Sequence, residues 1–144
     1  MKMLAALIGL FCTTTSKANT FHSQTDTIDF WHVFYNNKLI KQYDNHNSYQ
    51  VLTLKIDSIK VGDSITVRYF RDTPCGECNV YLIIECSYTS QALIARGTYT
   101  FCPLTLSVTD LKKIQKENKK ELLDVYYLED YNNYKISLFK IKLE

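Results

Sequence analysis

Short stretches in which β-branched and aromatic residues alternate with polar ones recur along the chain, and this period of two leaves few folds open. Polar turn residues separate the stretches at intervals of about ten residues. The chain has 11 Tyr and 7 Phe but only 4 Gly and 2 Pro. Because no β-α-β alternation is present, we predict an all-β, mainly antiparallel fold, a two-sheet β-sandwich of about eight or nine strands. A partly open β-barrel is the alternative.

The predicted strands span residues 27–35, 38–43, 49–56, 64–71, 80–88, 92–95, 98–106, 121–129 and 134–143. Asn36-Asn37 tolerates the left-handed backbone of a two-residue hairpin turn. In the last strand the apolar phase shifts between Leu138 and Phe139, which indicates a bulge or a change of neighbouring strands there. One short surface helix is expected near 110–119, with Thr109 as N-cap and Leu111 and Ile114 as its apolar anchors.

The amino-terminal residues 1–18 have the layout of a cleavable secretory signal peptide: a basic start at Lys2, a short apolar middle and a small polar end. The apolar run from Met3 to Cys12 is too short for the ~20 residues of a membrane-spanning helix. Cleavage after Ala18 would leave residues 19–144 as a single β-sandwich domain. We therefore expect an exported protein that is periplasmic, cell-surface or secreted, with no transmembrane segment.

Lipid anchoring at Cys12 is an alternative interpretation of the leader, although the bulky Phe11 before it is a poor fit. The leader also contains two of the 17 basic residues, Lys2 and Lys17, and none of the 15 acidic ones. The mature chain is then electrically balanced. Without a cationic field, nucleic acid is not an expected partner.

Cys75-Gly76-Glu77-Cys78 is the one motif that suggests chemical reactivity, because two thiols at this spacing can form a small disulfide, exchange with another disulfide or bind a soft metal ion. Four cysteines remain after cleavage, and with Cys86 and Cys102 they allow three connectivities. A strand is expected after the motif, so the helix N-terminus that usually activates such thiols is missing. Arg71 offers partial compensation.

A metal site would need more ligands than the Cys75–Cys78 pair, and His22, His32 and His46 do not stand at the usual spacing from it. We predict no metal and no cofactor. No serine sits in a Gly-flanked nucleophile elbow, and no phosphate-cradling loop is present. No catalytic residue is therefore assigned, and we lean against an enzyme.

Aromatic residues suggest a binding role instead, because exposed rings on β-sandwiches contact sugars or protein partners. The candidate patch comprises Trp31, Tyr35, Tyr43 and Tyr49, around the first hairpin and the loop after it. A second group gathers at the last hairpin, at Tyr126, Tyr127, Tyr131 and Tyr134. In both groups, packing inside the sandwich is the competing interpretation.

The stretch from Lys60 to Cys78 resembles segments of small exported bacterial β-sandwich proteins, which implies a compartment and an architecture but no catalytic residue. The sequence thus predicts a non-catalytic binding or interaction module with an unidentified protein or carbohydrate ligand. A thiol-disulfide or metal-binding protein that uses Cys75 and Cys78 is the alternative. A partner that binds loops such as 44–48 and 72–79 is a further hypothesis.

Overall fold

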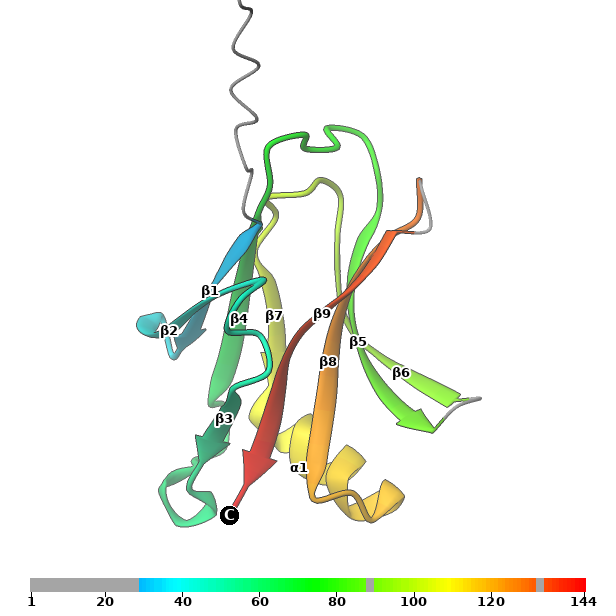
Figure 1. The fold of residues 1–144 in the computed structure, drawn as a ribbon. Coiled ribbons are helices and arrows are strands. Elements are labelled where there is room, and N and C mark those ends of the chain that lie inside the picture. The colour runs from blue at the N-terminus through cyan, green and yellow to red at the C-terminus, as the bar shows by residue number, and fades with distance from the viewer. Residues whose placement is uncertain (1–28, 88–89, 132–133) are drawn as a thin grey trace, which may run out of the picture.

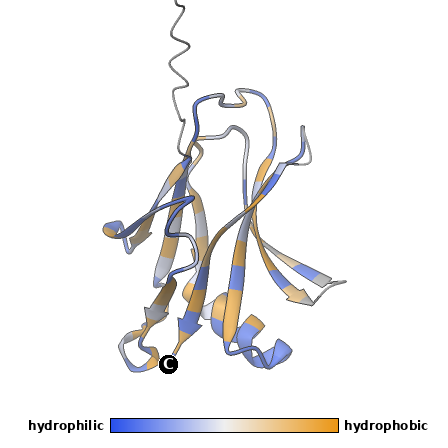
Figure 2. Ribbon diagram, in the orientation of Figure 1, coloured by the Kyte–Doolittle hydropathy of each residue, from blue (hydrophilic) through white to orange (hydrophobic). Residues whose placement is uncertain are grey.

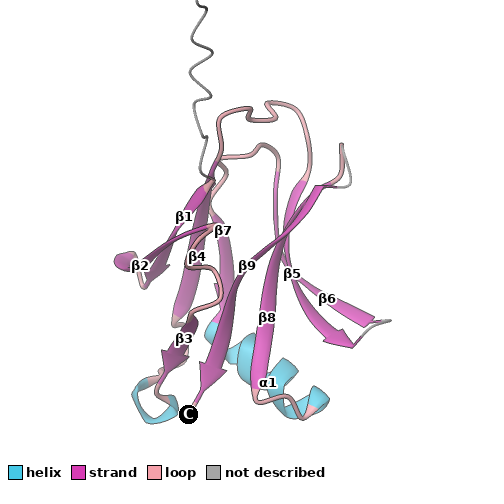
Figure 3. Cartoon of the chain, viewed as in Figure 1, coloured by secondary structure: helices cyan, strands magenta, loops and turns pink. Residues whose placement is uncertain are grey.

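The computed structural model describes residues 29–87, 90–131 and 134–144, and it shows two β-sheets packed face to face (Figures 1 and 3). The elements, in chain order, are β1 Phe30–Tyr35, β2 Lys38–Asp44, β3 Val51–Leu54, a 3-10 turn Ile56–Ser58, β4 Ser64–Phe70, β5 Val80–Ser87, β6 Ser90–Gly97, β7 Leu104–Ser107, α1 Val108–Asn118, β8 Leu122–Glu129 and β9 Tyr134–Leu143. The predicted all-β, mainly antiparallel sandwich with one helix is confirmed.

Sheet A has the strand order β2-β1-β4-β7, and sheet B has the order β3-β9-β8-β5-β6. Apart from the parallel pair β3–β9, the described strand pairs are antiparallel. The two sheets approach each other where β6 lies beside β7. The two sheets remain separate layers, so the chain forms a sandwich and not the partly open barrel that was the alternative prediction.

Side chains that alternate inward from both sheets form one apolar core. Trp31, Val33 and Tyr69 of sheet A are at most 1% exposed. Two aromatic contacts link the layers: the Tyr43 and Phe139 rings stack at 5.2 Å between centroids, and the Tyr69 and Tyr127 rings lie at 4.4 Å. Since a fully buried aromatic side chain contributes roughly 2–3 kcal/mol by its burial, these rings are central to the stability of the sandwich.

Local sequence signals explain the turn of the first hairpin and the bulge in the last strand. Asn36 and Asn37 adopt φ values of 47° and 67°, which is the two-residue turn that the sequence predicts. In the β8–β9 ladder Val125 pairs with Phe139, but Tyr126 pairs with Ser137. Leu138 is therefore the extra residue, and the bulge lets both Leu138 and Phe139 enter the core at 0% exposure.

The helix α1 closes one end of the sandwich, at the bottom of Figure 1. Its N-cap is Ser107, whose hydroxyl accepts a hydrogen bond from the Asp110 amide, so the prediction of Thr109 as N-cap is wrong. The reason is that β7 continues to Ser107 and the helix begins directly after it. Val108 and Leu111 are buried, while the second half of the helix is mostly hydrophilic (Figure 2).

Some element boundaries differ from the sequence expectation. The predicted strand 98–106 is replaced by a loop up to Pro103 and the short strand β7, while β6 is longer than the predicted 92–95. The leader 1–18, the cleavage position, Cys12 and His22 lie outside the described residues. Within the described ranges, no helix has the length and apolarity needed to cross a membrane.

Candidate binding surface and disulfide loop

The residues predicted to form an aromatic patch divide between core and surface. Trp31 and Tyr43 are 0% exposed, because their positions in β1 and β2 point toward sheet B, and burial raises the pKa of Tyr43 to about 12. The Tyr35 hydroxyl donates to the Asp63 carboxylate. Tyr49, before β3, is 72% exposed. Trp31 and Tyr43 are thus core residues and not part of an exposed patch.

The opposite phase of the same strand carries the aromatic surface. Phe30, His32 and Phe34 alternate with the buried Trp31 and Val33, so they lie on the outer side of sheet A and are partly exposed. Their neighbours on that side come from β4 and from the loop before β7. We call the outer surface formed by these side chains the aromatic face; it comprises Phe30, His32, Phe34, Arg68, Phe70 and Phe101.

Ring contacts make the aromatic face continuous. Phe30 lies opposite Phe70 in the β1–β4 ladder, and their rings stack with centroids 4.7 Å apart and planes 13° apart. The His32 ring lies 5.5 Å from Phe30 and 5.3 Å from Phe70. Phe101, which is 40% exposed, extends the row from Phe70 at 5.9 Å. Each pair is within the distance at which aromatic rings attract one another.

Charge is sparse at the centre of sheet A, although the edge strand β2 places Asp44 opposite Phe30. Strands β1, β4 and β7 contain no Lys, Asp or Glu, and Arg68 is their only Lys or Arg. The Arg68 guanidinium lies over the Phe34 ring at 5.4 Å and forms no ion pair within the described part of the chain. The other polar groups of these strands are the His32 imidazole and hydroxyls, of which those of Thr66 and Thr105 bond to each other at 2.8 Å.

The outer side of sheet B has the opposite character. Lys140 and Asp124 are cross-strand partners whose Nζ and Oδ1 atoms are 3.0 Å apart. Lys135 pairs with Glu85 at 3.3 Å, and its ammonium lies over the Tyr126 ring at 4.2 Å. Ion pairs of this kind add little stability but keep a sheet face solvated. The outer side of sheet B is therefore charged and well solvated, whereas the centre of the outer side of sheet A is mainly aromatic.

The second candidate element is the disulfide loop, residues 71–79, which crosses from β4 in sheet A to β5 in sheet B at the end opposite α1 (Figure 1). Cys75 and Cys78 are joined by a disulfide with Cα atoms 5.9 Å apart. Cys75 is partly exposed, whereas Cys78 is 6% exposed and packs in the core. A ring this small contributes only about 2 kcal/mol by chain entropy, so it is a weak staple.

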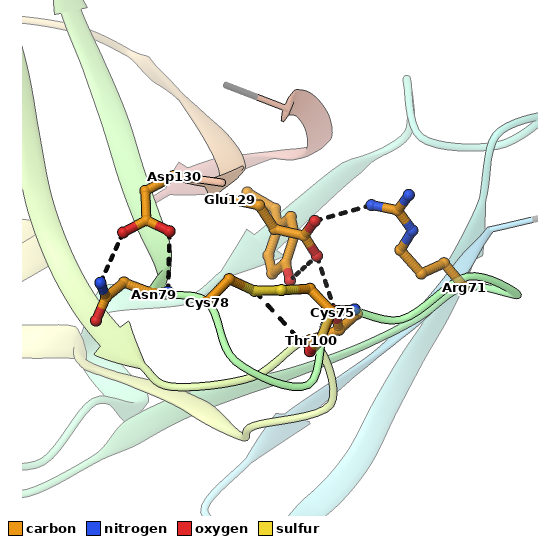
Figure 4. Close-up of a disulfide and its surroundings, with 8 residues drawn as sticks. Arg71, Cys75, Cys78, Asn79, Thr100, Glu129 and Asp130 are labelled. Atoms are coloured by element: carbon orange, nitrogen blue, oxygen red, sulfur yellow. Dashed lines mark hydrogen bonds and ion pairs between the residues drawn. A yellow bond between two sulfur atoms is a disulfide. The ribbon is translucent and has the colours of Figure 1, made fainter. Parts of the chain in front are cut away.

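Hydrogen bonds fix the loop independently of the sulfur atoms (Figure 4). The Cys75 amide donates to Thr100 Oγ1 at 2.7 Å, and the Thr100 amide donates to the Cys75 carbonyl at 3.0 Å. At the other end of the loop, the Asn79 amide donates to Asp130 Oδ1 at 3.0 Å, and the Asp130 amide donates to the Asn79 carbonyl at 3.1 Å. The disulfide is thus held on a rigid part of the chain.

Beneath the loop lies Glu129, a carboxylate that is 1% exposed. Its Oε2 accepts from Arg71 at 2.9 Å, and its Oε1 accepts from the hydroxyls of Thr100 at 2.8 Å and Tyr127 at 2.9 Å (Figure 4). Burial, together with the hydrogen bond to Glu129, raises the pKa of the Tyr127 hydroxyl well above its usual range. This buried cluster ties the disulfide loop, the β6–β7 loop and β8 together.

The remaining cysteines do not pair with each other or with the motif. Cys86 is buried on β5 and Cys102 is partly exposed in the β6–β7 loop, and both are free thiols among the described residues. Cys102 packs tightly: a Cβ placed on Gly97 would lie 2.7 Å from its Sγ atom. Across the described ranges, no three ligand-type side chains gather as a metal site.

The second tyrosine group is also divided. Tyr127 is buried, and Tyr134 donates its hydroxyl to Asp29 at 2.9 Å while the Arg71 guanidinium lies 4.5 Å from its ring. Tyr126 belongs to the charged outer side of sheet B. Tyr131 is 75% exposed beside the disulfide loop. These four residues therefore form no single surface.

An apolar cavity of about 390 Å³ opens between the edge strands β2 and β3. It is lined mainly by Tyr35, Ile40, Leu52, Leu54 and Ile59. Lys55 is the one charged side chain in its lining, so the cavity offers no acid-base pair.

Sequence reasoning missed Phe30, Phe34, Phe70 and Phe101 as surface residues and treated His32 as a core histidine. The signal was the scarcity of charged residues in the outward phase of β1 and β4, where Arg68 is the one charged residue, in contrast to β8 and β9.

Taken together, the chain is a β-sandwich with one charged and one aromatic outer face and a disulfide loop at the end away from its helix. Comparison with protein-family models, with curated proteins and with solved structures finds no match.

Proposed function

We propose that the protein is a non-catalytic interaction module that binds a protein partner through the aromatic face of sheet A. The observation that carries the proposal is the difference between the two outer faces: ion pairs cover sheet B, whereas rings and a single guanidinium cover the centre of sheet A. The cores of protein interfaces are enriched in aromatic residues and Arg and depleted in Lys, Glu and Asp. Strands β1, β4 and β7 have that composition.

The geometry of the rings favours a protein over a carbohydrate. A sugar stacks on the free face of an aromatic ring, but Phe30 and Phe70 turn their faces toward each other at 4.7 Å and present their edges outward. Ring edges and partly exposed apolar side chains fit the packed centre of a protein interface. Arg68 adds a positive charge at the middle of the face, so the partner is expected to supply a carboxylate there.

Export is part of the proposal. The leader-like segment 1–18 supports delivery outside the cytosol, to the periplasm, the cell surface or the medium. A disulfide such as Cys75–Cys78 persists in oxidising compartments, which agrees with export. The partner would then be an extracytoplasmic protein.

Site-specific photo-crosslinking tests the proposal. A photoreactive phenylalanine analogue is placed at Phe34 on the aromatic face and, as a matched control, at Tyr126 on the charged face of sheet B. We expect a discrete protein adduct from position 34 in cells that make the protein, and no such adduct from position 126. Excess unlabelled protein should compete the adduct away, and excess Phe70→Lys protein should not.

Three results would contradict the proposal: equal adducts from both positions, competition by the Phe70→Lys protein as strong as by the unsubstituted protein, or binding of a purified glycan that Phe34→Ala abolishes while no protein adduct forms. A far-UV circular dichroism spectrum of each variant establishes that its sandwich is intact. Phe34 and Phe70 are only partly buried, so both substitutions are expected to fold.

A further inference from the structure

We propose that Cys75–Cys78 is a reversible redox site, which accepts electrons from an external dithiol at the sulfur of Cys75. This activity goes beyond the proposed binding role and does not depend on it. The site consists of the disulfide, the guanidinium of Arg71 and the buried carboxylate of Glu129. Together they meet the requirements of thiol-disulfide exchange: one accessible sulfur, one protected sulfur and a nearby cation.

Accessibility separates the two sulfur atoms. Asp72 to Pro74 and Gly76-Glu77 are exposed, and Cys75 is partly exposed between them. Cys78 is 6% exposed and belongs to the core, against which the partly buried Cys75 packs. An incoming thiolate therefore reaches Cys75, while Cys78 stays shielded from external thiols. This one-sided exposure directs the attack to a single sulfur.

A cation lies beside the accessible cysteine. Arg71 and Cys75 line the same small cavity of about 160 Å³, together with Glu129 and Tyr131. Positive charge near a cysteine favours its thiolate, the form that takes part in exchange. The 2.9 Å ion pair with Glu129 holds the guanidinium in place at this cavity. Arg71 is the one cation in the lining of this cavity, and its ion pair with Glu129 reduces the support that it gives to a Cys75 thiolate.

The fold does not need the disulfide in order to hold the loop. Backbone hydrogen bonds to Thr100 and Asp130 fix the loop at both ends. The large apolar core lies between the sheets, and only Cys78 of the pair is buried in it. Reduction can therefore proceed with the sandwich intact, as a reversible site requires.

The exchange takes place in two steps. One thiolate of the dithiol attacks Cys75 Sγ and forms a mixed disulfide, while the Cys75–Cys78 bond breaks and its electron pair goes to Cys78 Sγ, which takes up a proton from water. The second thiolate of the dithiol then attacks the first sulfur of the same dithiol, which is bonded to Cys75 Sγ in the mixed disulfide. This attack releases the Cys75 thiolate. The Cys75 thiolate takes up a second proton from water. In sum, two electrons pass from the dithiol to the pair, the two protons that the dithiol loses go to the solvent, two protons from water reach Cys75 and Cys78, and the dithiol becomes a disulfide.

The test uses the full chain with Cys12→Ala, Cys86→Ala and Cys102→Ala, so that Cys75 and Cys78 are the only cysteines that remain. Dithiothreitol is the first probe, and reduction is followed by alkylation and mass spectrometry. We expect the folded protein to be reduced within about ten-fold of the rate of the same protein in denaturant, because Cys75 is accessible. Protection of about a hundred-fold or more would identify a structural staple and overturn the proposal.

Oxidised glutathione is the second probe, because a small disulfide can react with an accessible thiol without binding to a particular surface of the protein. With Cys78→Ser added, the remaining Cys75 should form a mixed disulfide at least about ten-fold faster than Cys78 does when Cys75→Ser is added instead. Equal rates would contradict the assignment of Cys75 as the attacked sulfur. In the Cys78→Ser protein, Arg71→Gln should move the pH midpoint of Cys75 alkylation upward. Lys113→Gln, at an exposed position on α1, should leave the midpoint unchanged. An unmoved midpoint for Arg71→Gln would remove Arg71 from the site.

Discussion

Replacing Glu129 by alanine removes the centre of the polar cluster beneath the disulfide loop. The Arg71 guanidinium loses its counter-ion, and the Tyr127 hydroxyl loses its acceptor. The Thr100 hydroxyl loses its 2.8 Å hydrogen bond and keeps only a 3.3 Å hydrogen bond to the Cys75 carbonyl. Glu129 is 1% exposed, so the groups that it binds are poorly placed to reach bulk water when it is removed. The substitution therefore leaves several polar groups unsatisfied in and around the core.

The expected loss in the free energy of unfolding follows from these contacts. Breaking a fully buried ion pair costs about 3–5 kcal/mol, but the Arg71 side chain is 18% exposed and can turn toward water. Each hydroxyl left without an acceptor adds about 1 kcal/mol. We expect Glu129→Ala to lower the free energy of unfolding by about 3 kcal/mol, and Glu129→Gln, which keeps two acceptor contacts, by about 1.5 kcal/mol.

Urea denaturation followed by circular dichroism measures this loss, and thermal unfolding should show a fall of about 10 °C for the alanine variant. Glu121→Gln is the matched control, because the Glu121 side chain is 77% exposed in its pair with Lys142 and should contribute less than about 0.5 kcal/mol. A loss below about 1 kcal/mol for Glu129→Ala would refute the role of Glu129 as a buried tie between loops.

Three further predictions concern the fold itself. Ser107→Ala should cost about 1 kcal/mol in unfolding free energy and Thr109→Ala almost nothing, since the observed cap is Ser107; the reverse order would contradict the assigned helix start. Hydrogen bonds, first of all that from the Tyr35 hydroxyl, lower the pKa of Asp63 from 3.8 to about 2. The stabilisation that ionised Asp63 provides is therefore present above pH 4 and is lost as the pH falls toward 2. Asp63→Asn should flatten the dependence of the unfolding free energy on pH in that window, and an unchanged dependence would rule out this contribution. Leu138→Ala should cost about 2–4 kcal/mol because Leu138 is 0% exposed, whereas Leu39→Ala, at 48% exposure, should cost much less; similar values would argue against the bulge.

The fold class follows from the sequence because the period of two is a local property that each strand carries by itself. The Asn36-Asn37 turn and the bulge at Leu138 were predictable for the same reason, since each leaves a trace in a few adjacent residues. The N-cap was missed because Ser107 and Thr109 are both suitable. Only the end of β7 against β4 decides between them.

The inward face of β1 could not be chosen from the sequence. Both phases of the strand are aromatic, and the Trp phase looked as suitable for a surface as the Phe phase. Pairing with β2 and β4 decides the matter, because it places Tyr43 and Tyr69 beside Trp31 and turns Phe30 and Phe34 outward. The spacing of Cys75 and Cys78 suggested their disulfide, but Glu129 comes from β8, more than fifty residues later, and no local pattern connects it with Arg71.

Hydroxyl-radical footprinting tests the role of the aromatic face most directly, because it compares the protein in the cells that make it with the purified protein and needs no knowledge of the partner. We expect oxidation of Phe34, Phe70 and His32 to fall several-fold in the cell, while oxidation of Tyr81 and Tyr126 on sheet B is unchanged. Equal oxidation of Phe34 and Phe70 in both settings would contradict the claim that this face is a binding surface.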